Sequence, residues 1–463
     1  MAAQLPEHSP ATAILTVAAG DLGLAGDWPA RMQAAGAENF PSCFPVTDLA
    51  VASIGAAGLA LADLLTVAGG TPAPVVVDRH LASAWFSYSL SPLGWSLPSP
   101  WDAIAGDYLL EDGWIKLHTN APHHRAAALA VLGCAGEREA VAASVSRWRG
   151  EALERAVVQA GGCAARMRSQ AKWRVHPQGQ AVAKEPLIAL SHAGAVSGRT
   201  WRPDPARPLR GIRVLDLTRV LAGPVATRFL AGLGADVLRI DPPDWDEPGI
   251  VPDVTLGKNC ARLDLRGGEG RARFEQLLAG ADILVHGYRP GALDGLGLGE
   301  AARRALNPGL IDVSLCAWGW SGPWCGRRGF DSLAQMSTGI ADSGMRWKGG
   351  ERPVPLPVQA LDHATGYFMA AAALRGLAIR LREGSAITAR LSLARTAAAL
   401  VGCGENATGP AFIGMRETDY DQKIERTPWG PARRLHSPVS VGGITLHWDH
   451  PAAELGSAQA LWV

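Results

Sequence analysis

The stretch GIRVLDLTRVLAGP, residues Gly211–Pro224, decides the fold because it joins a short apolar strand to the start of a helix. A second β-rich run, Asp236–Ile240, follows that helix, and further runs occur at Asp282–His286 and Leu310–Ser314. Strands that alternate with helices in this way form a parallel sheet with helices on both faces. The sequence therefore predicts an α/β fold with an open, doubly wound parallel sheet.

Other patterns predict further domains around this sheet. A strand at Asp112–His118, followed by amphipathic helices at His124–Leu132 and Glu137–Ala160, predicts a small α+β domain. A stretch rich in Pro and Arg, Ser197–Gly211, marks the boundary of the large domain. The expected divisions are a lead-in with a partial helix–strand repeat (1–98), the small domain with its linker (99–205), the large domain (206–400) and a C-terminal segment (401–463).

One helix–strand unit occurs twice. Val51–Thr66 predicts an Ala- and Leu-rich helix that leads through a GGTPAP turn to a strand-like run, Val75–Ala82. The later copy pairs the helix His363–Leu381 with the run Ile387–Ala394, and the two runs end in His-Leu-Ala and Ser-Leu-Ala. The repeat is faint but ordered. Residues 1–45 carry no sustained periodicity, and we expect a loosely packed lead-in there.

Composition excludes several functions. The chain has 44 Lys and Arg against 43 Asp and Glu, a net charge of +1, and no basic cluster, so no nucleic-acid partner is expected. The longest uncharged apolar run, Leu49–Ala62, is too short to cross a bilayer, so no membrane partner is expected. The start MAAQLPEHSP lacks a secretory pattern, which predicts a cytoplasmic protein. Seven cysteines without a CxxC pair argue against disulfides and a zinc site.

The arrangement of strand, turn, helix and strand that ends at Asp241 is also typical of dinucleotide-binding folds. The turn Thr218–Pro224 argues against NAD. It has one glycine where the GxGxxG pattern needs three, and Pro224 has no N–H to offer a pyrophosphate.

Five stretches point to a particular family by their order along the chain. They are Gly211–Pro224 with LGADVLRI (Leu233–Ile240), HGYRPGALDGLG (His286–Gly297), NPGLIDVSLCAWGWSGP (Asn307–Pro323), RGFDSLAQMSTG (Arg328–Gly339) and ALDHATG (Ala360–Gly366). In this order they resemble the class III CoA-transferases, a family that includes formyl-CoA transferases, carnitine dehydratases and α-methylacyl-CoA racemases. The resemblance implies a Rossmann-like large domain and an interlocked homodimer. The small domain usually follows the large one in this family, so its place at Pro100–Trp201 predicts a permuted chain.

The resemblance implies that Asp362 is the nucleophile. An ionised carboxylate can attack a thioester carbonyl to give a mixed anhydride, from which the CoA thiolate forms an aspartyl-CoA thioester before a second carboxylate reverses the sequence. We expect Asp362 between an apolar strand end, Pro355–Leu361, and the opening of a helix. Asp331 is implied in a positioning role. For both aspartates the alternative is an ordinary acid at a helix N-terminus.

The resemblance also implies coenzyme A or acyl-CoA as a substrate, a carboxylate acceptor, and no permanently bound cofactor or metal. The implied CoA contacts are Val220, Leu221, Ala222, Lys258, Leu263, Tyr288 and Arg289. A solvated surface lysine is the alternative for Lys258. The spacing of His118, His123 and His124 matches no common metal motif, and His363 is interpreted as a structural histidine.

Three functions remain open. The first is transfer of CoA between carboxylic acids. The second is an acyl-CoA racemase, isomerase or dehydratase. Phe330 argues against racemisation, because the racemases of the family carry a His before the Asp and inversion needs two titratable groups. The third is a CoA-binding subunit with weak or lost activity, since Leu221, Gly287 and Pro242-Pro243 replace the Gln, Asn and Arg of relatives.

Overall fold

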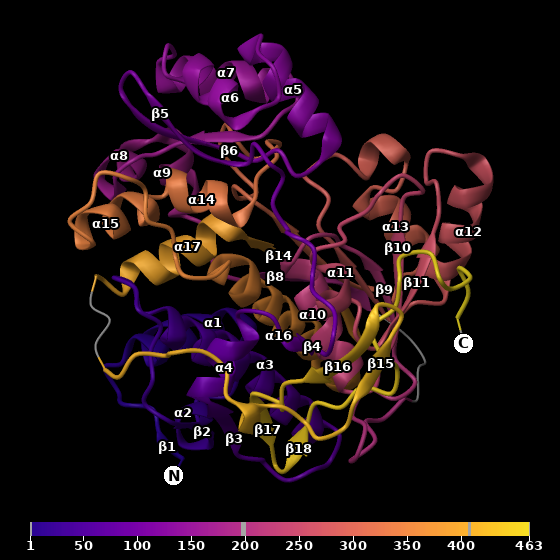
Figure 1. Ribbon diagram of the computed structural model, residues 1–463. Helices are drawn as coiled ribbons and strands as arrows, with labels where there is room; N and C mark the ends of the chain where they lie inside the picture. The colour runs from indigo at the N-terminus through magenta and orange to yellow at the C-terminus, as the bar shows by residue number, and fades with distance from the viewer. Residues whose placement is uncertain (1, 196–200, 406–408, 463) are drawn as a thin grey trace.

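The computed structural model describes residues 2–195, 201–405 and 409–462, and a seven-stranded sheet lies at its centre (Figure 1). The strand order is β11-β10-β9-β12-β13-β14-β8, and every neighbouring pair is parallel except β14 and β8. The strands are β8 (Ala189–Ala195), β9 (Arg213–Leu217), β10 (Asp236–Asp241), β11 (Lys258–Arg262), β12 (Ile283–His286), β13 (Ile311–Cys316) and β14 (Ser385–Ser392). The predicted doubly wound parallel sheet is confirmed, with an antiparallel edge strand added to it.

The apolar strands of the sheet are covered on both faces. Val214 and Ile283 belong to the core shared with α10 (Ala222–Gly232) and α16 (Ala360–Glu383). Leu215 and Leu284, which point to the opposite face, belong to the core shared with α12 (Gly268–Ala279). Continuous apolar strands are expected in a parallel sheet buried on both sides.

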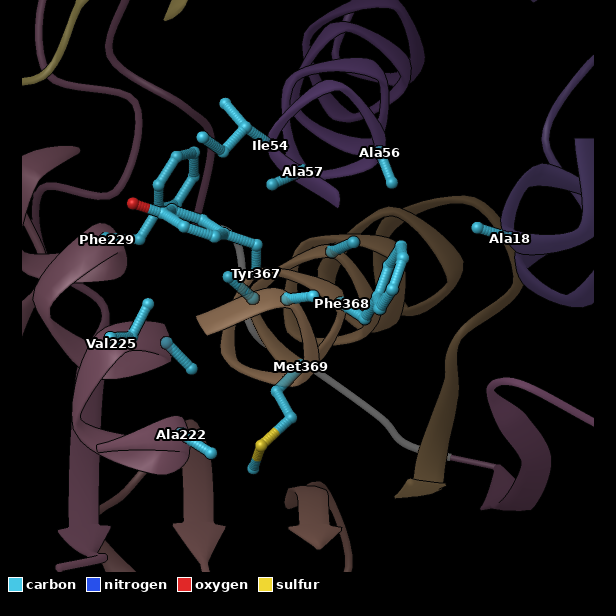
Figure 2. Packing of buried hydrophobic residues seen from close by; sticks show 14 of the residues in the cluster. Ala18, Ile54, Ala56, Ala57, Ala222, Val225, Phe229, Tyr367, Phe368 and Met369 are labelled. Carbon is cyan, nitrogen blue, oxygen red and sulfur yellow. The ribbon is translucent and has the colours of Figure 1, made fainter. Parts of the chain in front are cut away.

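Helix α16 lies between the sheet region and the N-terminal part of the chain. Figure 2 shows α10 and α3 (Val46–Val67) against two sides of α16, with Ala18 of α1 (Pro10–Leu22) nearby. Of the described helices, α3 alone is long and apolar enough to cross a membrane, and it is packed as a core helix against α16. The predicted loosely packed lead-in is wrong, because α1 buries an apolar stripe that runs from Ala11 to Leu22.

The two repeated units have the same order of elements. In the first, α3 is followed by β3 (Val75–Asp78) and α4 (Arg79–Trp85); in the second, α16 is followed by β14 and α17 (Leu393–Gly402). Each strand ends where a side chain caps the next helix. The Leu81 N–H donates to the Asp78 carboxylate at 2.9 Å, and the Arg395 N–H donates to the Ser392 hydroxyl at 3.2 Å. The predicted strands therefore end earlier than expected.

A small antiparallel sheet with three helices precedes the large sheet in the chain and lies at the top of Figure 1. It consists of β5 (Gly106–Leu110), β6 (Gly113–Leu117), β7 (Ala164–Arg166), α5 (Pro122–Leu132), α6 (Arg138–Val145) and α7 (Gly150–Gln159). The single helix predicted over Glu137–Ala160 is thus two helices. Part of the predicted linker, residues 197–200, lies outside the described residues.

The C-terminal segment returns to the N-terminal part of the chain. Strand β16 (Gly430–Arg434) pairs with β4 (Leu90–Pro92), and β17 (Val439–Val441) pairs with β3. The remaining elements are β1 (Ala3–Gln4), α2 (Trp28–Arg31), β2 (Met32–Ala35), α8 (Gln170–Val175), α9 (Pro177–Val182), α11 (Val251–Val254), η1 (Asp294–Leu296), α13 (Glu300–Leu306), α14 (Asp331–Ser337), α15 (Ile340–Trp347), η2 (Glu417–Asp419), β15 (Glu425–Thr427) and β18 (Ile444–Thr445).

The close crossing of α10 and α16 depends on Gly366, and this can be tested by adding one methyl group. A Cβ at Gly366 would meet the Ala222 carbonyl oxygen at 2.3 Å, so Gly366→Ala will lower the free energy of unfolding by about 1–3 kcal/mol. The measurement is urea unfolding followed by circular dichroism. In the control, Gly20→Ala in α1 meets no atom within 4 Å and will not destabilise the protein. Equal effects of the two substitutions would contradict this account.

Candidate functional site

Two cavities meet at Asp362. The first, of about 490 Å³, has Phe86, Tyr88 and Trp101 in its wall, and we call it the aromatic cavity. The second, of about 380 Å³, is the basic cavity. Its cationic lining residues are Arg219, Arg289, Arg327 and Arg328. Five residues line both cavities, namely Val220, Leu221, Trp245, Phe330 and Asp362. A molecule that occupies both cavities must therefore pass Asp362.

The basic cavity lies where the strand order of the large sheet reverses. Strands β9 and β12 are neighbours there, although the helices that follow them in the chain pack on opposite faces of the sheet. The segments that follow them, Thr218–Val220 and Gly287–Arg289, both line the cavity. Such a crevice at the carboxyl ends of the strands is the usual ligand site of doubly wound sheets.

Asp362 is the third residue of α16, and it does not cap that helix. The cap comes from Asp331, whose carboxylate accepts hydrogen bonds from the Leu361 N–H at 2.8 Å and the Asp362 N–H at 3.0 Å. The Gln335 amide also donates to Asp331. None of the described side chains or backbone groups donates a hydrogen bond to the Asp362 carboxylate, which lines both cavities. The strand predicted over Pro355–Leu361 is wrong, since no strand forms there.

Burial governs the charge of this pair of carboxylates. Desolvation raises the pKa of Asp362 well above its ordinary value of 3.8, and the neighbouring charge of Asp331 raises it further. Burial also raises the pKa of Asp331, to about 6, although the Gln335 amide and two backbone N–H groups oppose this rise. Because Asp331 accepts these hydrogen bonds, it holds its negative charge more readily than Asp362 does.

The turn between the two cavities is strained and held in place. Val220 has a φ of 65°, which is unfavourable for a β-branched residue. Its N–H donates to the Glu247 carboxylate at 2.8 Å, and the same carboxylate accepts from the buried Arg239 guanidinium at 2.5 Å. Sequence reasoning missed both residues; the only available signal was a charged residue, Arg239, inside an apolar strand.

Most of the predicted ligand contacts lie together. Val220, Leu221, Ala222, Tyr288 and Arg289 all line the basic cavity. The Arg219 guanidinium, which was not predicted, donates to the Tyr288 hydroxyl at 3.0 Å and lies over the Tyr288 ring.

Lys258 and Leu263 do not line either cavity. Lys258 is buried, and its ammonium donates to the Asp216 carboxylate and to the Pro224 carbonyl, both at 3.0 Å. Both interpretations of Lys258, as a CoA contact and as a solvated surface lysine, are therefore wrong. A lysine that compensates a buried carboxylate neither reaches a phosphate nor faces solvent. Leu263 packs against the apolar core on the α12 side of the sheet.

Four histidines lie near Asp362. His118 and His363 line the aromatic cavity, whereas His123 and His124 line the basic cavity. The His118 ring stacks on Phe330 with the ring centres 3.7 Å apart, and His363 stacks on Phe86. Burial lowers the pKa of both His118 and His363 to about 3, so both rings are neutral at pH 7. Among the described residues, no group of three His, Cys, Asp or Glu side chains could hold a metal ion.

Part of the chain is similar to known CoA-transferases. Residues 209–418 match the family model described as CoA-transferase family III. A probable fatty acyl-CoA transferase of Mycobacterium tuberculosis, Rv3272, is 34% identical over 204 residues, which cover 41% of this chain and 51% of the relative. The mouse succinyl-CoA:glutarate CoA-transferase is 32% identical over 246 residues, covering 48% and 55%.

Among solved structures, the orthorhombic crystal structure of Rv3272 is similar at 32% identity with a TM-score of 0.40, covering 43% of this chain and 58% of that one. The chain spans about half the length of the curated relatives it matches.

The buried ion pair between Lys258 and Asp216 predicts a large loss of stability when one partner is removed. Lys258→Met leaves the Asp216 carboxylate buried without its cation and will lower the free energy of unfolding by about 3–5 kcal/mol. The measurement is the midpoint of urea unfolding. Arg289→Met, at an exposed cation of the basic cavity, is the control and will change stability by less than about 0.5 kcal/mol. A stable Lys258→Met variant would show that Lys258 is not a structural residue.

Proposed function

We propose that the protein transfers CoA from an acyl-CoA to a carboxylic acid, with Asp362 as the nucleophile, because residues 209–418 match the model of CoA-transferase family III. The observation that carries the proposal is the position of Asp362. Its carboxylate lines both cavities, while Asp331 performs the capping role that would otherwise occupy it.

The charges of the two cavities favour one orientation of the substrate. CoA carries phosphate groups, and the guanidinium groups of Arg219, Arg289 and Arg328 in the basic cavity are suitable partners for them. The acyl group then extends past Val220 into the aromatic cavity. In this orientation the thioester carbonyl lies at the junction, beside Asp362.

The covalent steps follow from this arrangement. The ionised Asp362 carboxylate attacks the thioester carbonyl, the carbon–sulfur bond breaks, and CoA leaves as the thiolate while a mixed anhydride forms. The thiolate attacks the Asp362 carbonyl and releases the first acid, leaving an aspartyl-CoA thioester. An incoming carboxylate attacks this thioester, and the returning thiolate then attacks the acyl carbonyl of the new anhydride. These steps release the new acyl-CoA and restore Asp362.

Exchange of an α-proton is the second candidate, because His118 and His363 share the aromatic cavity with Asp362. Their low pKa values make both imidazoles weak bases, and efficient proton transfer needs a pKa near the working pH. The lowered pKa values of these two histidines therefore favour transfer over racemisation.

Hydroxylamine will trap the activated Asp362. Incubation of the protein with an acyl-CoA and hydroxylamine will place a hydroxamate on Asp362, detected by intact mass and peptide mapping, because anhydrides and thioesters react with this nucleophile. Asp362→Asn will abolish the adduct. Asp48→Asn is a matched control in the first turn of α3, where Asp48 is paired with Arg79 at 3.0 Å, and it will leave the adduct unchanged. Bound CoA without any adduct would favour the isomerase or the inactive binding subunit.

The rate of this trapping will depend on the ionisation of Asp362. Only the ionised carboxylate attacks, and the pKa of Asp362 is raised above 3.8, so the rate will fall as the pH is lowered through that raised pKa. Asp331→Asn removes the charge that contributes to the rise, so the midpoint will move to lower pH. The measurement is the hydroxamate rate across a pH series. A lower rate at every pH with an unchanged midpoint would mean that Asp331 acts only structurally.

A further inference from the structure

We propose that the acyl group selected by this site is bulky and uncharged, without a second carboxylate. The inference rests on the proposed function, because it assigns the acyl group to the aromatic cavity. It goes further by naming a substrate class that the family match leaves open. Three features of the cavity wall support it: its width and apolar surface, its charge, and the hydrogen bonds that its polar groups already make within the protein.

The wall of the aromatic cavity is apolar and wide. Phe86, Tyr88, Trp101 and Phe330 present aromatic rings, and Val358 adds aliphatic surface. A volume of about 490 Å³ is within the range of pockets that hold drug-sized ligands. A formyl or acetyl group would leave most of this surface in contact with water, whereas a ring or a long chain would bury it.

The charges of the wall disfavour an anionic acyl group. None of the lining residues is a lysine or an arginine, and the two histidines are neutral. The lining includes Asp102, Asp246, Glu247 and Asp253 in addition to the proposed nucleophile. A second carboxylate on the substrate would therefore be desolvated without a cation in the lining to pair with.

The acidic groups of the wall are largely satisfied within the protein, which leaves little to attract a cationic substrate. Glu247 is paired with Arg239 at 2.5 Å, and Asp253 is paired with the buried Arg228 at 2.5 Å. Asp102 accepts from the Thr119 hydroxyl at 2.7 Å.

The neutral polar groups of the wall also form hydrogen bonds within the protein. The Tyr88 hydroxyl donates to the Gly249 carbonyl at 3.1 Å. The Asn120 amide donates to the Pro100 carbonyl at 2.7 Å, and its oxygen accepts from the Asp102 N–H at 3.1 Å. With these groups occupied, the surface that Tyr88 and Asn120 leave for a ligand is chiefly apolar, and burial of apolar area becomes the main source of selectivity.

The test compares donors in the hydroxylamine assay, which reads the first half-reaction and needs no acceptor. The panel contains octanoyl- and phenylacetyl-CoA (bulky, uncharged), acetyl-CoA (small), succinyl-CoA (anionic) and 4-trimethylammoniobutyryl-CoA (cationic). We expect the two bulky uncharged donors to react at least about tenfold faster than the others. Equal or faster reaction with any other donor overturns the inference and leaves the transferase intact. No adduct from any donor overturns the proposed function itself.

Substitution of Trp101 tests the wall directly. Trp101 is 41% exposed, so Trp101→Ala will not threaten the core, and it will slow the reaction of octanoyl- and phenylacetyl-CoA by about tenfold while acetyl-CoA is unaffected. Trp347→Ala is the matched control, because Trp347 is 47% exposed and lines neither cavity. It will change none of the rates. An equal loss for all donors in Trp101→Ala, or an unchanged donor preference, would overturn the inference.

Discussion

The burial of α16 is the constraint on which the rest of the structure depends. The helix has apolar residues on every side, and such a helix must be covered all round. The sheet and α10 cover part of its surface, and α3 covers another part (Figure 2). The N-terminal part of the chain is therefore required for the core of the large sheet. The same burial removes water from the first turn of α16, which raises the pKa of Asp362.

In the proposed function, two carboxylates at this helix end divide two tasks that one residue cannot perform well. A carboxylate that caps a helix is stabilised by the backbone N–H groups and loses nucleophilicity. Asp331 receives those hydrogen bonds, and Asp362 remains a desolvated carboxylate without donors among the described residues. In the repeated unit, Asp48 occupies the first turn of α3 but is paired with Arg79. The same position in the two copies of the repeat thus holds Asp48, whose charge is neutralised by Arg79, and Asp362, whose carboxylate has no such partner in the part of the chain that the structure describes.

The sequence predicts features that are local or periodic. The parallel strands follow from apolar runs, and Asp362 and the turn at Val220 follow from contiguous motifs. The missed features are contacts between distant segments. Lys258 lies in a polar context, GKNCARLDLR, and nothing local shows that Asp216 will bury it. Similarly, no motif pairs Glu247 with the turn, and the Ala-rich composition of residues 1–45 hides the apolar stripe of α1.

The site combines parts of the chain that the family match includes with parts that it does not. Asp331, Asp362 and the turn at Val220 lie inside residues 209–418, so the reactive groups are those of the matched region. Phe86 and Trp101, which form part of the wall of the aromatic cavity, lie outside it, whereas Phe330 and Val358 of the same wall lie inside it. In the proposed function, the covalent chemistry therefore lies within the matched region, whereas the wall that contacts the acyl group draws on both parts of the chain.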